Sequence, residues 1–424
     1  MTSTGLVLRA VVAMVVLAAN SACRRSEEGP GDESPAVTER SPAAGNRLFD
    51  EVFARIRASS VDPLDDQELY RRAAEGMIEE LDDPYAMLRF PNQRSLPPGD
   101  QPLPSGMFLD RRDGLLVAVA TLPGSPADSA GIRPGDIIVN IDSVAMNAFR
   151  LDRAATLLEG PPGTSVAVRV RKPSGRIVSL TMRRAPARDA SLLQATSLGN
   201  GVGLLRLTRL GPGVADSASR AIAGLRERGV QRLVLDLRGS VQGGGDQRSG
   251  AELADLFLDR GSALVVNRMR RASGTPRLVD SAASPFAGMP LAVLIDGGTA
   301  GAAEVAAGAL QDHDRAVVIG APSFGRGVTQ STFSLGGGAE LTLTTAVWMT
   351  PNGRQIQRPP RTAPGDSVVR PTVRSDAGRV LVGGGGIVPD RMIADGAGDP
   401  VLAEARRVLT GATTVETVFA LLNR

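Results

Sequence analysis

Two glycine-containing segments hold the side chains of this sequence that could do chemistry together. The first runs Gly298-Thr299-Ala300-Gly301-Ala302-Ala303-Glu304, and the second runs Phe324-Gly325-Arg326-Gly327-Val328-Thr329-Gln330. Nucleophilic catalysis needs a hydroxyl or thiol beside a base that removes its proton before attack. The candidate nucleophiles in or beside the two segments are the hydroxyls of Thr299, Ser323 and Ser331.

Bases for such a nucleophile are scarce in this chain. It has one histidine, His313, and one lysine, Lys172. A lone histidine at a helix end, such as His313, is typical of the surface. Hydrolysis through any of the three hydroxyls would require His313 or a carboxylate close by, and the sequence shows no such pair.

The elements around the two segments predict how they are positioned. Leu291–Ile295 is a short apolar run typical of a buried strand, Ala302–Asp312 suits a helix, and Arg315–Ile319 is a second strand. Phe324–Gln330 is predicted to be a glycine-rich loop. Strand, glycine turn, helix and strand form a βαβ unit of a parallel sheet, whose turns are common sites of chemistry.

This stretch resembles the carboxyl-terminal processing peptidases of family S41, which use a serine and a lysine. The family reads G-S-A-S-A-S-E at the turn and F-G-K-G-x-V-Q at the loop, with the lysine 25 positions after the nucleophile. Here the spacing is retained from 301 to 326, but the nucleophile position holds Gly301 and the base position holds Arg326. Gln330 matches the assisting glutamine, with a loop side chain that bonds the backbone as the simpler interpretation.

The two replacements remove the chemistry that the family uses. Glycine has no side chain with which to attack, and Arg stays protonated at a pH where a buried Lys can lose its proton. The sequence therefore predicts a peptidase fold without an intact catalytic residue. Glu304, which closes the family's serine motif, is a candidate ion-pair partner of Arg326.

Residues 105–184 resemble a PDZ domain. The signature is Gly124-Ser125-Pro126-Ala127-Asp128-Ser129-Ala130-Gly131-Ile132-Arg133-Pro134-Gly135-Asp136. PDZ domains bind peptide C-termini by strand addition, and the resemblance places the peptide-binding loop at Gly106, Met107, Phe108 and Leu109. Phe108 replaces a glycine of that loop, so a PDZ domain that only packs on its neighbour stays an open alternative.

A third departure lies where the family reads D-L-R-x-N-x-G-G and supplies an oxyanion donor. This chain reads Arg238-Gly239-Ser240-Val241-Gln242-Gly243-Gly244-Gly245, with about two inserted residues. The resemblance assigns oxyanion-like positions to Ala302, Gly243 and Gly244. An oxyanion hole needs accurately placed donors, so an insertion here bears directly on activity.

The family motifs recur in order over roughly residues 46–410. They predict an α/β (α+β) chain with a helical N-terminal segment at 46–100, the PDZ domain at 105–184, a ClpP/crotonase-like S41 peptidase core at 195–410 and a C-terminal helix or tail at 411–424. The aromatic content of 3% and the absence of aromatics among the arginines argue against a nucleic-acid partner. No His/Cys/Asp cluster has metal-ligand spacing, and no cofactor is predicted.

The N-terminus predicts export. Ala10–Ala19 is apolar and too short to span a bilayer, which is typical of a signal peptide over residues 1–22. Cys23, the only cysteine, follows it and is the predicted lipidation site; ordinary cleavage nearby is the alternative. Residues 24–45 are polar and Pro/Gly/Ser-rich, which predicts a disordered tether. We therefore expect a periplasmic or cell-envelope protein held to a membrane by a lipid anchor.

Three hypotheses of function follow from these motifs. The leading one is a non-hydrolytic pseudopeptidase that binds peptide or protein C-termini, with an active peptidase homologue as a further candidate partner. The second is an active serine-type endopeptidase with a rearranged site. The third is an envelope scaffold that neither binds nor cleaves peptides.

Overall fold

The computed structural model describes residues 42–62, 64–81, 83, 85–91, 105–112, 115–122, 124–146, 151–185, 193–240, 247–259, 261–269, 277–279, 283–358, 370–393 and 398–422. The chain divides into two compact units, Met1–Ala74 and Glu75–Arg424. Cys23, the signal peptide and the tether as far as residue 41 lie outside the described residues, as do Gly243 and Gly244.

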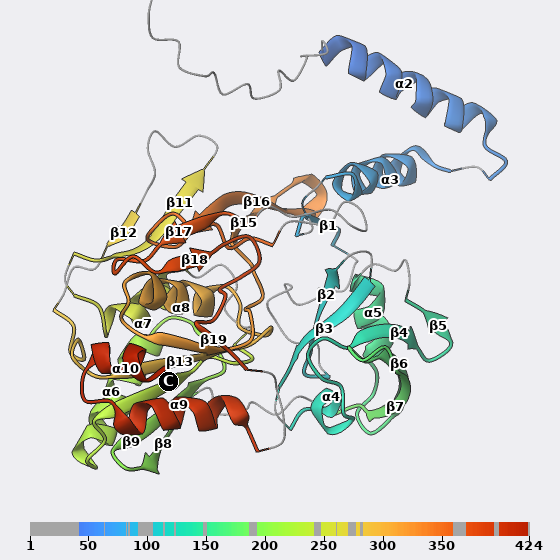
Figure 1. Ribbon diagram of the computed structural model, residues 1–424. Coiled ribbons are helices and arrows are strands. Elements are labelled where there is room, and N and C mark those ends of the chain that lie inside the picture. The colour runs from blue at the N-terminus through green and yellow to red at the C-terminus, as the bar shows by residue number, and fades with distance from the viewer. Residues whose placement is uncertain are drawn as a thin grey trace, which may run out of the picture. The chain divides into compact units, whose positions relative to one another are not determined.

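A six-stranded sheet forms the centre of the peptidase-like core, in the order β19-β14-β13-β10-β9-β8 (Figure 1). Its strands are β8 (Leu193–Gly199), β9 (Val202–Leu207), β10 (Arg232–Asp236), β13 (Leu291–Ile295), β14 (Val317–Gly320) and β19 (Arg391–Met392). Every neighbouring pair is parallel except β8 and β9. The carboxyl ends of β9, β10, β13 and β14 therefore share one edge, where the turn after β13 lies.

Helices cover both faces of this sheet. They are α6 (Val214–Glu227), α7 (Gln247–Asp255), α8 (Ala302–Asp312), α9 (Pro400–Gly411) and α10 (Val415–Leu422). Leu233 and Leu235 of β10 pack in one core cluster with residues of α6, α7 and α8, whereas Val234 packs in another with α9 and α10. Alternate side chains of a strand point to opposite faces, and covering both faces explains why β13 and the three central residues of β10 are apolar.

A second, five-stranded sheet carries the predicted base loop. It comprises β1 (Met87–Arg89), β11 (Ala263–Met269), β12 (Arg277–Val279), β15 (Val328–Ser334) and β16 (Glu340–Met349), and the turn η1 (Gly336–Gly338) joins β15 to β16. A separate pair joins β17 (Thr372–Arg374) to β18 (Val380–Val382). Because β15 begins at Val328, Arg326 lies two residues before a paired strand.

The PDZ domain is a sheet with two helices. Its strands follow the order β2-β3-β4-β6-β7, with β5 paired to β4. Their bounds are β2 (Met107–Arg112), β3 (Leu115–Thr121), β4 (Ile137–Ile141), β5 (Val144–Ala145), β6 (Ser165–Arg171) and β7 (Ile177–Arg183), with helices α4 (Pro126–Ser129) and α5 (Leu151–Leu158). The Ser125 hydroxyl caps α4, and Pro126 is its first residue.

Two helices precede the PDZ domain, α2 (Pro42–Ser59) and α3 (Asp66–Glu79). The carboxylate of Asp65 accepts the N–H of Glu68 at 2.7 Å and so caps the N-terminus of α3. The rings of Phe53 and Tyr70 lie 4.4 Å apart, so α2 contacts α3 through the side chain of Phe53. Among the described residues, no helix is long and apolar enough to cross a membrane.

The predicted α/β (α+β) fold class is confirmed, and β13 and α8 have the expected bounds. Three boundaries differ. The strand predicted at Arg315–Ile319 is β14 at Val317–Gly320, because its main chain pairs with β13 only from Val317 onward. The tether predicted to reach residue 45 ends sooner, because α2 begins at Pro42, a residue suited to a first turn. The predicted loop Phe324–Gln330 is a strand from Val328 onward, because the main chain there pairs with β16.

Gly250 sets how closely α7 approaches the start of α8. A Cβ at this position would lie 2.0 Å from the carbonyl oxygen of Ala302. We therefore expect Gly250→Ala to reduce the free energy of unfolding by about 1–3 kcal/mol or more. Gly224→Ala in α6 is the matched control, because no atom lies within 4 Å of its Cβ. Urea unfolding of both variants tests this, and equal stabilities would contradict it.

Candidate functional site

The turn after β13 is held by the carboxylate of Asp296. Its Oδ1 accepts the N–H groups of Gly239 and Gly298, both at 2.9 Å. Burial raises the pKa of this carboxyl. Asp296 therefore joins the turn to the segment that follows β10, and the two come together at the carboxyl edge of the sheet.

Gly301, the predicted nucleophile position, begins helix α8 as its N-cap. Its backbone lies at φ 57° and ψ −117°, a conformation that is strained for any residue with a Cβ. Its N–H donates to Oε2 of Glu304 at 3.1 Å. The main chain thus makes a sharp strand-to-helix turn at a residue that has no side chain to present.

Glu304 joins this turn to the predicted base loop. It is fully buried, and its carboxylate accepts from the Ser323 hydroxyl at 2.5 Å, from Gly325 N–H at 2.7 Å and from Arg326 N–H at 2.9 Å. Burial raises the pKa of this carboxyl, while these hydrogen bonds oppose the shift. One side chain therefore sets the distance between positions 301 and 326.

The guanidinium of Arg326 is stacked between two aromatic rings. Its central carbon lies 4.9 Å from the centre of the Tyr85 ring and 5.4 Å from that of Phe324. The residue is 7% exposed. The expected ion pair with Glu304 is replaced by a main-chain contact, because the carboxylate bonds the N–H of Arg326 while the guanidinium lies over the rings. Cation–π stacking at a desolvated site fixes the plane of the guanidinium.

Each of the three candidate nucleophiles is occupied in the structure. Buried Ser323 donates to Glu304 and accepts the N–H of Ile387 at 2.6 Å. Buried Thr299 donates to the carbonyl of Leu237 at 2.9 Å and accepts the N–H of Asp296 at 3.0 Å.

Ser331 lies on β15, where its hydroxyl bonds that of Thr345 at 2.8 Å. All three hydroxyls therefore hold the fold together.

The two candidate bases lie away from the turn. His313 caps the other end of helix α8, roughly 18 Å along its axis from Gly301, and its Nδ1 lies 2.6 Å from Oδ2 of Asp376. Lys172 belongs to the PDZ domain, where its Nζ donates to Asp136 at 2.7 Å. Neither one pairs with a candidate hydroxyl.

Gln330 bonds the backbone, in line with the simpler interpretation of this residue. Its Nε2 donates to the carbonyl of Tyr85 at 2.8 Å. Nearby, the carboxylate of Asp83 accepts the N–H of Thr344 at 2.8 Å. These contacts hold Tyr85 against the second sheet and so place its ring over Arg326, a role that the sequence did not reveal.

One predicted oxyanion-like position keeps a donor. Among the described residues no acceptor is recorded for the N–H of Ala302, whereas the N–H of Gly301 bonds Glu304 and that of Ala303 bonds Ala300. The other two positions, Gly243 and Gly244, lie outside the described residues and stay predictions.

The segment before that loop is anchored by an arginine that sequence reasoning did not single out. The guanidinium of Arg238 donates to Asp236 at 2.7 Å and to Asp399 at 2.8 Å. The hydrogen bond from Arg238 lowers the pKa of the Asp399 carboxyl. Asp399 also caps α9 by accepting the N–H of Leu402, so this network joins β10 to that helix. The D-L-R motif contains Arg238, but the sequence gives no sign that Asp399 is its partner.

The predicted PDZ loop packs inward with its side chains. Met107 and Phe108 are at most 1% exposed, Leu109 is buried, and Gly106 has a positive φ of 73°. Phe108 shares an apolar cluster with Ala300 and Phe324 of the peptidase-like core. The residue that replaces the family's glycine therefore packs in one cluster with residues of both glycine-containing segments.

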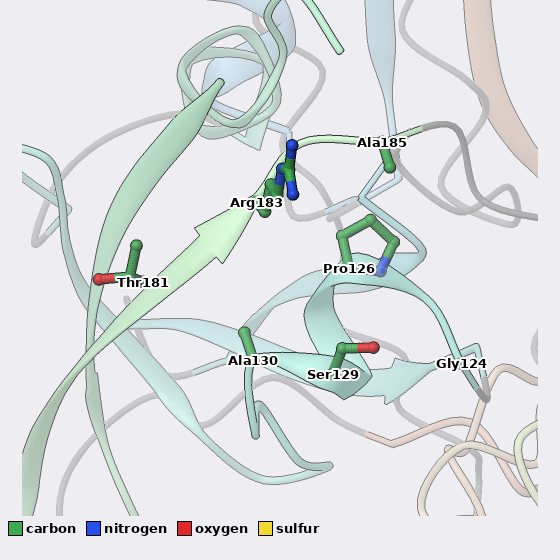
Figure 2. A pocket seen from close by; sticks show the side chains of 7 residues that line it. All are labelled: Gly124, Pro126, Ser129, Ala130, Thr181, Arg183 and Ala185. Atoms are coloured by element: carbon green, nitrogen blue, oxygen red, sulfur yellow. The ribbon is translucent and has the colours of Figure 1, made fainter. Parts of the chain in front are cut away.

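The PDZ domain also has an open cavity of about 390 Å³ between α4 and β7. Figure 2 shows Pro126, Ser129 and Ala130 on the α4 side, with Thr181 and Arg183 on the strand. This cavity is distinct from the predicted peptide-binding loop at Gly106–Leu109.

Comparisons with known proteins agree with this architecture. The model of peptidase family S41 matches residues 201–365, and a PDZ domain model matches residues 118–172. The carboxyl-terminal-processing protease of Picosynechococcus is 33% identical over 300 residues, which cover 69% of this chain and 71% of that protein. This chain belongs to peptidase family S41.

Two further similar proteins match more of the chain. The carboxy-terminal processing protease CtpA of Bacillus subtilis is 26% identical over 333 residues, which cover 77% of this chain and 70% of that protein. The solved structure of a photosystem II D1 C-terminal processing protease superposes with a TM-score of 0.65 at 25% identity, over 88% of this chain and 99% of that one. The predicted family membership is confirmed.

Replacing Glu304 with glutamine tests whether it holds the site. An amide nitrogen cannot accept the N–H groups of Gly301 and Arg326, and each buried donor left unpaired costs about 1–3 kcal/mol. We therefore expect Glu304→Gln to be less stable than the wild type. Because the folded pKa of Glu304 is raised above the ordinary value of 4.5, its contribution to stability falls as pH rises through and above that value.

The stability gap between wild type and Glu304→Gln should therefore be widest at acid pH. Urea unfolding of both proteins between about pH 4 and pH 7 measures this gap, and groups common to the two proteins cancel. A gap that widens toward neutral pH would contradict the raised pKa.

Proposed function

We propose that this member of family S41 binds peptide or protein C-termini at the cell envelope without hydrolysing them. The observation that carries the proposal is that the hydroxyls at the site are hydrogen-bonded within the fold. Gly301 offers no hydroxyl, and the hydroxyls of Thr299, Ser323 and Ser331 are bonded within the fold. Ser323 does donate to the carboxylate of Glu304, but a rearranged peptidase would have to expose this buried hydroxyl and release it from the N–H of Ile387.

Three features favour binding of a peptide end, two at the turn after β13 and one in the PDZ domain. The N-terminus of α8 favours negative charge, and the N–H of Ala302 points from its first turn. Arg326 supplies a permanent positive charge with a fixed plane. In the PDZ domain, β2 is an edge strand to which an extended peptide can add through its main chain, even though the side chains of Met107 and Phe108 are buried.

Fluorescence anisotropy with an unstructured labelled peptide that ends in apolar residues tests the binding claim. We expect the free-acid peptide to bind and the amidated peptide to bind more weakly, because only the former has a terminal carboxylate. The bound peptide should be recovered with unchanged mass. If neither peptide bound, the result would contradict the proposal and favour the passive scaffold.

Membrane attachment is a separate part of the proposal and rests on Cys23. In a bacterial host we expect the wild type to fractionate with membranes and Cys23→Ala to be released, because the acyl anchor needs the thiol. Mass spectrometry of the mature N-terminus provides the second measurement. A wild-type protein recovered in the soluble fraction, with a mature N-terminus other than Cys23, would contradict lipidation.

A further inference from the structure

Strand β7 is an open edge of the PDZ sheet, at the opposite end of the strand order from β2. Just beyond its last residue, the N–H of Arg184 donates to the carbonyl of Thr164, on the β6 side, at 2.7 Å. The main chain of an antiparallel strand turns alternately toward its partner and away from it. The N–H and C=O groups of Thr181 and Arg183 therefore point away from β6, where a further strand could bond them.

The cavity between α4 and β7 adds polar side chains to this edge (Figure 2). Ser129 of α4 and Thr181 of the strand supply hydroxyls, and Arg183 supplies a guanidinium. Among the described residues, no hydrogen bond or ion pair of these three side chains is recorded. The volume of about 390 Å³ lies in the range of pockets that hold ligands. An open strand beside such a cavity suits a peptide that adds to the sheet edge.

The charge of this part of the PDZ domain is positive. Strands β6 and β7 contain arginines and no acidic residue. Exposed Arg169 of β6 lies opposite Ser179, so its side chain is on the same face of the sheet as that of Arg183. The one carboxylate of α4, Asp128, is already bonded to Arg133 at 2.9 Å. A field of one sign favours an acidic ligand.

An extended peptide fits these features better than a membrane surface does. Anionic headgroups would be attracted to the arginines, but they do not supply the alternating donors and acceptors that the edge of β7 needs. A peptide main chain supplies both, and its side chains can enter the cavity.

We propose that the cavity between α4 and β7 binds an extended acidic segment of a partner protein. The segment adds to β7 as a further strand, through the main chain of Thr181 and Arg183, and places a carboxylate side chain against the Arg183 guanidinium. This site takes an internal segment and needs no free C-terminus. It is separate from the predicted peptide-binding loop at Gly106–Leu109 and from Arg326, so it stands without the proposed function.

Fluorescence anisotropy of the full-length protein tests the charge preference. The probe is a short labelled peptide of alternating Val and Glu, blocked at both ends, and its matched control has Gln in place of Glu. The acidic peptide should bind, and the neutral one should bind more weakly. Arg183→Gln should weaken binding of the acidic peptide by about fivefold, the scale of an exposed ion pair. Arg176→Gln, in the turn before β7, is the matched control variant and should bind as the wild type does.

A second variant tests strand addition. Thr181→Pro removes an outward N–H but keeps the bonds to β6, since proline is tolerated on the open side of an edge strand. It should lose the acidic peptide, whereas Ile177→Pro, at the far end of β7, should retain it. Thermal unfolding checks that each variant is folded.

Equal affinity of the wild type for the two peptides would overturn the proposal. Wild-type affinity for the acidic peptide in both Arg183→Gln and Thr181→Pro would overturn it as well. Binding of phosphatidylglycerol vesicles without binding of the acidic peptide would assign the arginines to a membrane and overturn the peptide site.

Discussion

The double variant Gly301→Ser with Arg326→Lys is expected to cleave an unstructured peptide, while each single variant stays at background. A nucleophile and its base act as a unit, so neither one alone restores the reaction. We expect turnover to rise by about 10²-fold or more above wild type, the scale of positioned acid–base catalysis. We expect the fold to position the two new side chains, because the Glu304 carboxylate accepts the main-chain N–H groups of both positions, 301 and 326.

Stability measurements accompany this experiment. A serine at φ 57° and ψ −117° is strained, so Gly301→Ser should cost about 1–3 kcal/mol of stability. A folded double variant that remains silent would contradict the claim that the dyad alone is missing. It would assign the loss of activity to the inserted loop at 239–245 instead.

Replacing Arg326 with alanine should abolish the preference for a free peptide carboxylate. Hydrogen bonds between a guanidinium and a carboxylate contribute about 1.5–3 kcal/mol, which corresponds to roughly 10- to 100-fold in affinity. Anisotropy titrations should show weaker binding of the free acid and unchanged binding of the amide. Arg326→Met is the matched control for bulk, and it should show the same loss of discrimination.

A modest loss of stability should accompany the Arg326→Ala change. The guanidinium stacks on Tyr85 and Phe324, and such contacts contribute about 0.5–2 kcal/mol each. Lower thermal stability with equal affinities for both peptides would show that Arg326 only supports the fold. That outcome would contradict its role as a carboxylate ligand.

The local elements around the site could be predicted from sequence because their signals are local. The apolar run Leu291–Ile295 and the alanine-rich Ala302–Asp312 have the observed bounds, and the motif spacing located Gly301 and Arg326. The end of the loop at Val328 was wrong, because it depends on pairing with β16, which follows later in the chain.

The contacts that decide the chemistry are tertiary and left no such signal. Ser323 is a plain loop residue in the sequence, yet its hydroxyl lies between Glu304 and Ile387. The guanidinium of Arg326 was expected to form an ion pair with a carboxylate. Instead it lies over the ring of Tyr85, which comes more than 200 positions earlier in the chain.

The most direct test of the central claim is incubation of purified wild-type protein with an unstructured substrate that ends in apolar residues. Mass spectrometry should find the substrate intact after prolonged incubation, because position 301 has no hydroxyl and the hydroxyls of Thr299 and Ser323 are buried and bonded within the fold. The claim would be contradicted by cleavage that persists through further purification and disappears in Thr299→Ala, Ser323→Ala or Ser331→Ala.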